Sequence, residues 1–87
     1  MTIGIAIIIN EIGLHARPAS VFCNTALQFQ CDITFKLKDK SVNAKSIMAV
    51  MAAKVKYGDE IEIICDGADE KEAMTALLNV VRDGLGE

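Results

Sequence analysis

In the first thirty residues, the spacing of the apolar residues changes from a period of two to a helical period. This change constrains the fold more than any other feature. Isoleucine recurs at every second position near the start, as in a strand with one apolar face; these residues are Ile3, Ile5, Ile7 and Ile9. We expect that face to be buried, with Ala6 and Ile8 on the opposite face. A helical stripe follows, made of Ala19, Phe22, Cys23, Ala26 and Phe29. Pro18 suits the first turn of this helix, where its missing N–H costs no helical hydrogen bond.

The rest of the chain alternates between the same two periods. Strand patterns cover residues 33–38, 41–43 and 60–65. A short helix capped by the Ser46 hydroxyl would bury Val50 and Ala53 and end at residues 57–59. The last helix has an apolar stripe made of Met74, Leu77, Leu78 and Val81. It would begin with a capping box of Asp69 and Glu72 and end at Gly84 or Gly86.

The element order is therefore β-α-β-β-α-β-α, and only the second and third strands have a link as short as a hairpin. Two helices long enough to cover a sheet on one face indicate an open-faced α/β sandwich. The chain has 87 residues, of which 52% are hydrophobic and one is proline, so we expect a single folded domain over residues 1–87.

The three cysteines favour neither a disulfide framework nor a zinc site, because they form no even set and no C-x-x-C pair. We expect Cys23, Cys31 and Cys65 to be reduced and buried in a cytoplasmic protein. One histidine with scattered cysteines lacks metal-ligand spacing, so no metal site is expected. The apolar stretch from Ile3 to Ile9 is too short to span a bilayer and has no cleavage pattern after it.

Charge is divided unevenly along the chain, although the net charge is only −3. Residues 1–57 contain seven Lys and Arg against three acids, whereas residues 58–87 contain two against nine. The first part has no Lys/Arg run, and the chain has only four aromatic residues, so nucleic-acid binding is not indicated. The basic part is better suited to an acidic protein partner or a phosphate group.

His15, the only histidine, is the candidate reactive residue. A neutral imidazole is a nucleophile near pH 7, and a helix N-terminus stabilises an attached phosphate through free N–H groups, here those of Ala16 and Arg17. The Arg17 side chain can add a charge-assisted contact, and Gly13 permits a tight turn before the helix. The pattern favours a phosphoryl carrier; the alternative is an ordinary hydrogen-bonded surface histidine.

A second candidate region surrounds Ser46. Ile47, Met48 and Met51 occupy neighbouring positions of one short helix, which predicts either an exposed, adaptable docking patch or an ordinary core helix. The Ser46 hydroxyl is a typical N-cap, and a phosphate on it would add negative charge to a basic surface.

Three runs together resemble the HPr family, the histidine-containing phosphocarriers of the phosphoenolpyruvate-dependent sugar phosphotransferase system. They are residues 13–20, 42–48 and 66–70, and the resemblance extends over essentially the whole chain. It implies an α+β open-faced β-sandwich, in which three helices cover one face of a four-stranded antiparallel sheet. It also implies a cytoplasmic, monomeric protein without a cofactor.

The resemblance also implies site residues and partners. His15 would receive a phosphoryl on Nδ1 from enzyme I and pass it to enzyme IIA domains, with Arg17 beside the phosphohistidine. Ser46 would be modified by an HPr kinase/phosphorylase, as in Gram-positive members that act as corepressors of a catabolite-control transcription factor. The residues expected to bind partners are Ser20, Lys45, Ile47, Met48 and Met51.

Five positions differ from the usual family pattern. Ile12 replaces a small polar residue, Asn24 and Leu27 replace residues that are often basic, and Ala49 and Lys54 replace common glycines. Ile12, Asn24 and Leu27 raise the alternative of a divergent phosphorelay paralogue. The segment from Lys45 to Met51 raises a second alternative, a mainly regulatory module that works through Ser46.

Overall fold

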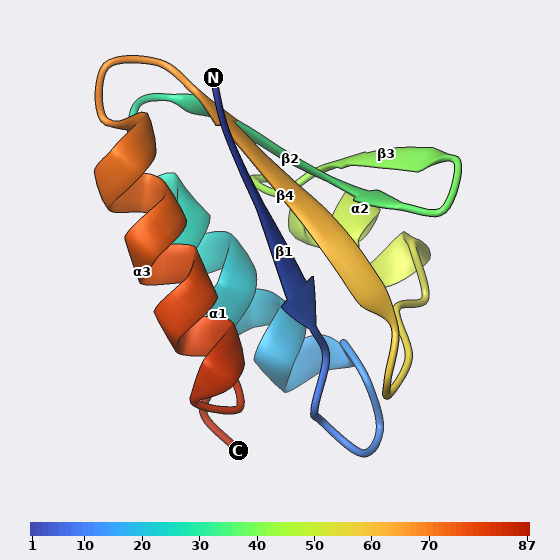
Figure 1. The fold of residues 1–87 in the computed structure, drawn as a ribbon. Helices are drawn as coiled ribbons and strands as arrows, with labels where there is room; N and C mark the ends of the chain where they lie inside the picture. The colour runs from blue at the N-terminus through green and yellow to red at the C-terminus, as the bar shows by residue number, and fades with distance from the viewer.

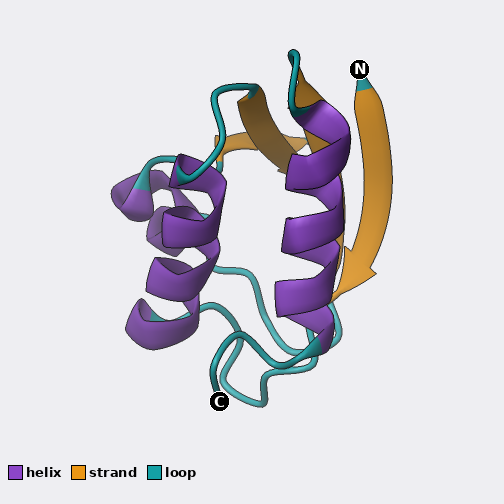
Figure 2. Ribbon diagram, turned by 90° about the vertical axis from the view of Figure 1, so that its left-hand side faces the viewer, coloured by secondary structure: helices purple, strands orange, loops and turns teal.

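The computed structural model describes residues 1–87 and shows a four-stranded antiparallel sheet with three helices on one face (Figure 1). The strands are β1 (Thr2–Ile7), β2 (Asp32–Leu37), β3 (Lys40–Asn43) and β4 (Glu60–Asp66). The helices are α1 (Ala16–Leu27), α2 (Ile47–Ala52) and α3 (Glu70–Arg82). The strand order is β1-β4-β2-β3, and Figure 2 shows the helices and the sheet as separate layers. The expected open-faced sandwich is confirmed.

The core lies between these two layers. Phe22 of α1 meets Phe35 of β2 edge to face, with ring centroids 5.7 Å apart, which is a favoured aromatic geometry. The predicted stripe of α1 is correct, since its first four residues are buried and Phe29 is half-buried. Val50 and Ala53 are also buried, as expected for the short helix.

The prediction for the faces of β1 is wrong. The isoleucines at positions 3, 5, 7 and 9 are 50–55% exposed, whereas Ala6 and Ile8 are buried. Helix α3 covers the side of β1 that has small residues: a Cβ at Gly4 would lie 2.7 Å from Met74 Sδ. A period of two shows which residues share a face, but in a strand that is apolar on both faces it does not show which face is covered.

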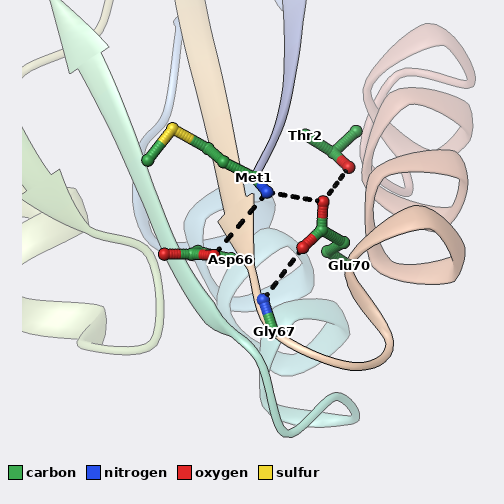
Figure 3. Close-up of polar contacts among 5 residues, drawn as sticks. All are labelled: Met1, Thr2, Asp66, Gly67 and Glu70. Carbon is green, nitrogen blue, oxygen red and sulfur yellow. Dashed lines mark hydrogen bonds and ion pairs between the residues drawn. The ribbon is translucent and has the colours of Figure 1, made fainter.

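The start of β1 is tied to the start of α3 (Figure 3). The Glu70 carboxylate accepts a hydrogen bond from the Thr2 hydroxyl and pairs with the Met1 amine at 2.9 Å. Its other oxygen accepts from the Gly67 N–H at 3.2 Å, and the Met1 amine also pairs with Asp66 at 3.7 Å. The Thr2 hydrogen bond and then the amine lower the pKa of Glu70 to about 2.

The predicted capping box of α3 is also wrong. Asp69 is the N-cap residue, but its side chain makes no capping hydrogen bond. Instead the carboxylate accepts from the backbone N–H groups of Gln30 at 2.8 Å and Cys31 at 2.9 Å. The hydrogen bond from Gln30 is the main reason that the pKa of Asp69 is lowered. Asp69 therefore joins the start of α3 to the start of β2, while Glu72 is exposed.

The end of α3 was predicted correctly, whereas the end of α2 was not. Helix α3 ends at Arg82, and Gly84 follows with a φ of 84°, as expected for a glycine just beyond a helix. Helix α2 ends at Ala52, well before residues 57–59. Lys54 has a φ of 54°, and this left-handed conformation stops the helix without a glycine.

Candidate functional site

The loop between β1 and α1 is fixed by its neighbours before the chain reaches His15. The Leu14 N–H donates to the Val55 carbonyl at 3.0 Å, and the Gly13 N–H donates to the Asn10 carbonyl at 2.9 Å. Gly13 has a φ of 78°, and a Cβ on it would lie 2.3 Å from the Val55 oxygen. Only glycine fits there, so the turn before the helix depends on Gly13 as the sequence indicated.

His15 is the N-cap residue of α1. Its backbone is extended, and its carbonyl accepts the first helical hydrogen bond from the Ala19 N–H at 2.9 Å. The imidazole makes no capping hydrogen bond, and its side chain is 36% exposed. The ring is therefore at the positive end of a helix and open to a partner's site.

One ring nitrogen of His15 is engaged and the other is not. Nε2 lies 3.0 Å from Glu87 Oε2, whereas Nδ1 makes no hydrogen bond within the chain. The other Glu87 oxygen, Oε1, accepts from Asn10 Nδ2 at 3.0 Å, and Asn10 Nδ2 also donates to the Gly84 carbonyl at 2.7 Å. Asn10 and Glu87 could not be identified from the sequence, because contacts over 72 to 77 positions leave no local pattern.

Ala16 and Arg17 are the first two residues of α1, and both are exposed. The backbone N–H groups of a first helical turn have no partner within the helix. The Arg17 guanidinium is in none of the ion pairs of the chain, and Arg17 lies in the first turn of α1, two residues after His15. A nucleophilic nitrogen, free N–H groups and a cation thus occur together, which are the groups needed to accept and hold a phosphoryl.

The second region, around Ser46, is partly an exposed patch and partly a core helix. Ser46 is the N-cap of α2, and its hydroxyl accepts from the Ala49 N–H at 3.3 Å, which confirms the predicted cap. Val50 is fully buried, whereas Met48 is 79% exposed and Met51 is 44% exposed. Ile47 is half-buried. The helix therefore contributes one side to the core and presents its methionines to solvent.

The predicted partner-binding residues are distributed along α1 and α2 rather than gathered at His15. Ser20 is exposed in the second turn of α1. Lys45 is half-buried, and its Nζ donates to the Phe29 carbonyl at 2.6 Å, just beyond the other end of α1. Because twelve helical residues rise about 18 Å, Lys45 is anchored far from His15.

The cysteines do not offer a second nucleophile. All three are free and buried, as the sequence predicted. Burial raises the pKa of Cys31 to about 12, and burial also raises the pKa values of Cys23 and Cys65. No helix in the structure has the length and apolarity needed to cross a membrane.

Comparison with known proteins agrees with this geometry. The family model described as "PTS HPr component phosphorylation site" matches residues 5–83. The chain belongs to the HPr family. Phosphocarrier protein HPr of Neisseria meningitidis is 45% identical over 80 residues, which are 92% of this chain and 90% of that HPr.

Solved HPr-family structures have the same fold. HPr of Thermoanaerobacter tengcongensis is 40% identical, with a TM-score of 0.96 over 100% of this chain and 98% of that one. Crh of Bacillus subtilis, a catabolite repression protein described as a domain-swapped dimer, is 38% identical. Its TM-score is 0.76 over 91% of each chain.

Proposed function

We propose that this HPr-family chain carries a phosphoryl group on His15, taking it from phosphorylated enzyme I and passing it to sugar-specific enzyme IIA domains. The single observation that carries the proposal is that His15 caps α1 with its Nδ1 unengaged and its ring exposed. In the transfer, the Nδ1 lone pair forms a bond to phosphorus while the bond between phosphorus and the donor breaks. The electron pair of the broken bond stays with the donor.

The start of α1 supplies the groups that stabilise the bound phosphoryl. The N–H groups of Ala16 and Arg17 lie at the positive end of the helix, where an anion is stabilised. The unpaired Arg17 guanidinium can add a charge-assisted hydrogen bond to a phosphoryl oxygen. No side chain of the chain competes for that guanidinium, so its full charge is available to the phosphoryl group.

The proposed docking surface comprises Ser20 of α1, Lys45 just before α2, and Ile47, Met48 and Met51 of α2. Lys45 and Ile47 are half-buried, and the other three residues are exposed. Met48 and Met51 are the apolar centre of this surface, since flexible methionines adapt to more than one partner. Enzyme I and the enzyme IIA domains would use this surface in turn, with the protein acting as a cytoplasmic monomer. Light scattering after size-exclusion chromatography tests the monomeric state.

Incubation with enzyme I and phosphoenolpyruvate tests the carrier function. We expect an acid-labile, base-stable phosphoprotein in the wild type and none in His15→Ala. Arg17→Ala should still be labelled, but more slowly, because it retains the nucleophile. Labelling of His15→Ala at the wild-type level would refute the assignment.

Ser46 supports a second, regulatory function. Its hydroxyl caps α2, and a phosphate at a helix N-terminus is compatible with the helix while adding negative charge beside exposed Met48. The likeness to Crh, a catabolite repression protein, also favours a regulatory function. We propose that an HPr kinase/phosphorylase modifies Ser46 and that the product acts as a corepressor with a catabolite-control transcription factor.

The regulatory function is tested with that kinase and ATP. An acid-stable phosphate should form on the wild type and on His15→Ala, but not on Ser46→Ala. Folding of Ser46→Ala is checked by circular dichroism, since loss of the cap costs about 1 kcal/mol. If mass spectrometry finds no phosphate on Ser46 of the wild type, the regulatory proposal fails while the carrier proposal stands.

A further inference from the structure

Glu87 lies between two hydrogen-bond donors. Its Oε1 accepts from Asn10 Nδ2 at 3.0 Å, and its Oε2 lies 3.0 Å from His15 Nε2. A carboxylate has only acceptors, so it can accept from both sides at once. An amide of the same shape would present its NH₂ group to one of the two neighbours.

Asn10 fixes this carboxylate in position. The residue is only 5% exposed, although asparagine is usually found at the surface. Nδ2 faces two acceptors, Glu87 Oε1 and the Gly84 carbonyl at 2.7 Å, so a flipped amide would place Oδ1 against both. Oδ1 itself is buried without a partner. The orientation of Asn10 is therefore set by the two groups that it holds.

The arrangement determines which ring nitrogen of neutral His15 carries the proton. A carboxylate at Nε2 favours the tautomer with the proton on Nε2, and this leaves the lone pair on Nδ1. We propose that Asn10 and Glu87 form a positioning pair that holds His15 in its Nδ1-nucleophilic tautomer. This inference rests on the proposed function, since it concerns the same transfer to Nδ1.

Glu87 also faces the charge that develops in the transfer. When neutral His15 bonds to phosphorus through Nδ1, the ring gains a positive charge and keeps its proton on Nε2. That N–H then points at a carboxylate 3.0 Å away, and this contact becomes stronger as the charge grows. Asn10 does not touch the ring and acts only through Glu87.

Glu87→Gln is the sharpest test, because it keeps the size of the side chain and removes one acceptor. If the new amide oxygen stays on Asn10, its NH₂ group faces His15 Nε2 and moves the proton to Nδ1. If the amide is reversed, its NH₂ group faces the Asn10 Nδ2 group. Two donors cannot form a hydrogen bond, so the contact between positions 10 and 87 is lost. In either case we expect ¹⁵N chemical shifts of the His15 ring to show less Nε2–H tautomer than in the wild type.

The rate of phosphoryl acceptance from enzyme I should fall about tenfold in Glu87→Gln, by analogy with the carboxylates that orient metal-binding histidines, whose loss costs about tenfold or more in activity. Asn10→Ala should give a smaller loss in the same direction. The double variant Asn10→Ala/Glu87→Ala should be no slower than Glu87→Ala alone, since Asn10 works through Glu87. Glu11→Gln, an exposed acid next to Asn10, is the matched control and should leave tautomer and rate unchanged.

An unchanged tautomer in Glu87→Gln, or a changed tautomer with an unchanged rate, would overturn the positioning role. Additive losses in the double variant would remove Asn10 from it. The NMR measurement needs no partner protein, so it stands even if wild-type His15 is never phosphorylated, in which case the proposed function fails instead.

Discussion

Gly4 of β1 lies directly against Met74 of α3, and a Cβ on Gly4 would be 2.7 Å from the Met74 sulfur. The helix reaches this close to the sheet because β1 presents its small residues, rather than its row of isoleucines, to the core. Ile8 is the one large residue on that side and is fully buried just beyond the end of the strand.

The faces of β1 can be tested by comparing Ile8→Ala with Ile5→Ala. Ile8→Ala leaves a cavity in the core and should lower the free energy of unfolding by about 2–5 kcal/mol. Ile5 is half exposed, so Ile5→Ala should cost about 1 kcal/mol or less. Urea unfolding followed by circular dichroism measures both, and equal losses would contradict the observed faces.

Gly13→Ala should destabilise the protein and disturb the site together. The new Cβ would meet the Val55 carbonyl, and the left-handed backbone adds strain, so we expect a loss of about 2 kcal/mol or more. Because Leu14 and His15 follow directly, phosphoryl acceptance should also slow. Gly58→Ala is the control: its φ is 84°, but nothing lies within 4 Å of the new Cβ.

That control separates the two causes. Gly58→Ala should show only the backbone cost of about 1 kcal/mol and a normal rate of phosphoryl acceptance. Thermal unfolding together with a labelling time course measures both effects. A Gly13→Ala protein as stable as Gly58→Ala would show that the contact with Val55 does not constrain the turn.

Acid should weaken the fold partly through Glu70. Its pKa is lowered from 4.5 to about 2 in the folded protein, so its contribution to stability is complete above pH 4.5 and is lost as the pH falls toward 2. The difference in free energy of unfolding between wild type and Glu70→Gln should therefore shrink over that range. Urea unfolding at a series of pH values measures this difference. For Glu72→Gln, which removes an exposed acid without a hydrogen bond, the difference from the wild type should not shrink as the pH falls.

Lys54→Gly should stabilise the protein. Lys54 has a φ of 54°, where a side chain costs about 1–2 kcal/mol, and glycine relieves this while making the unfolded chain more flexible. We expect a net gain of about 0.5–1 kcal/mol and a higher Tm. Lys56→Gly, at a position without a positive φ, should lower the Tm instead, and a lower Tm in both variants would refute the strain.

The parts of the fold that the sequence predicted well are those with local causes. Pro18 and a regular apolar stripe define the start and the buried side of α1, and a serine before an apolar run defines the cap of α2. The position of His15 at a helix start could be predicted because a glycine turn precedes it and Pro18 follows it closely in the chain.

The missed features depend on contacts between distant segments. The buried face of β1 is decided by where α3 packs, and β1 is apolar on both sides. Asp69 follows a capping pattern, yet its carboxylate accepts hydrogen bonds from the backbone N–H groups of Gln30 and Cys31 instead. Glu87 and His15 are 72 positions apart in the chain, so a search for local motifs cannot reveal their contact.

Only one face of the sheet is covered by helices, and the other face carries neither α1 nor α2 (Figure 2). The solvent-facing residues of the strands can therefore change without altering the surface through which His15 would meet other proteins. A fluorophore or a surface linkage attached at Ile5 would leave that surface free, so exchange with successive partners could be followed on a single immobilised molecule.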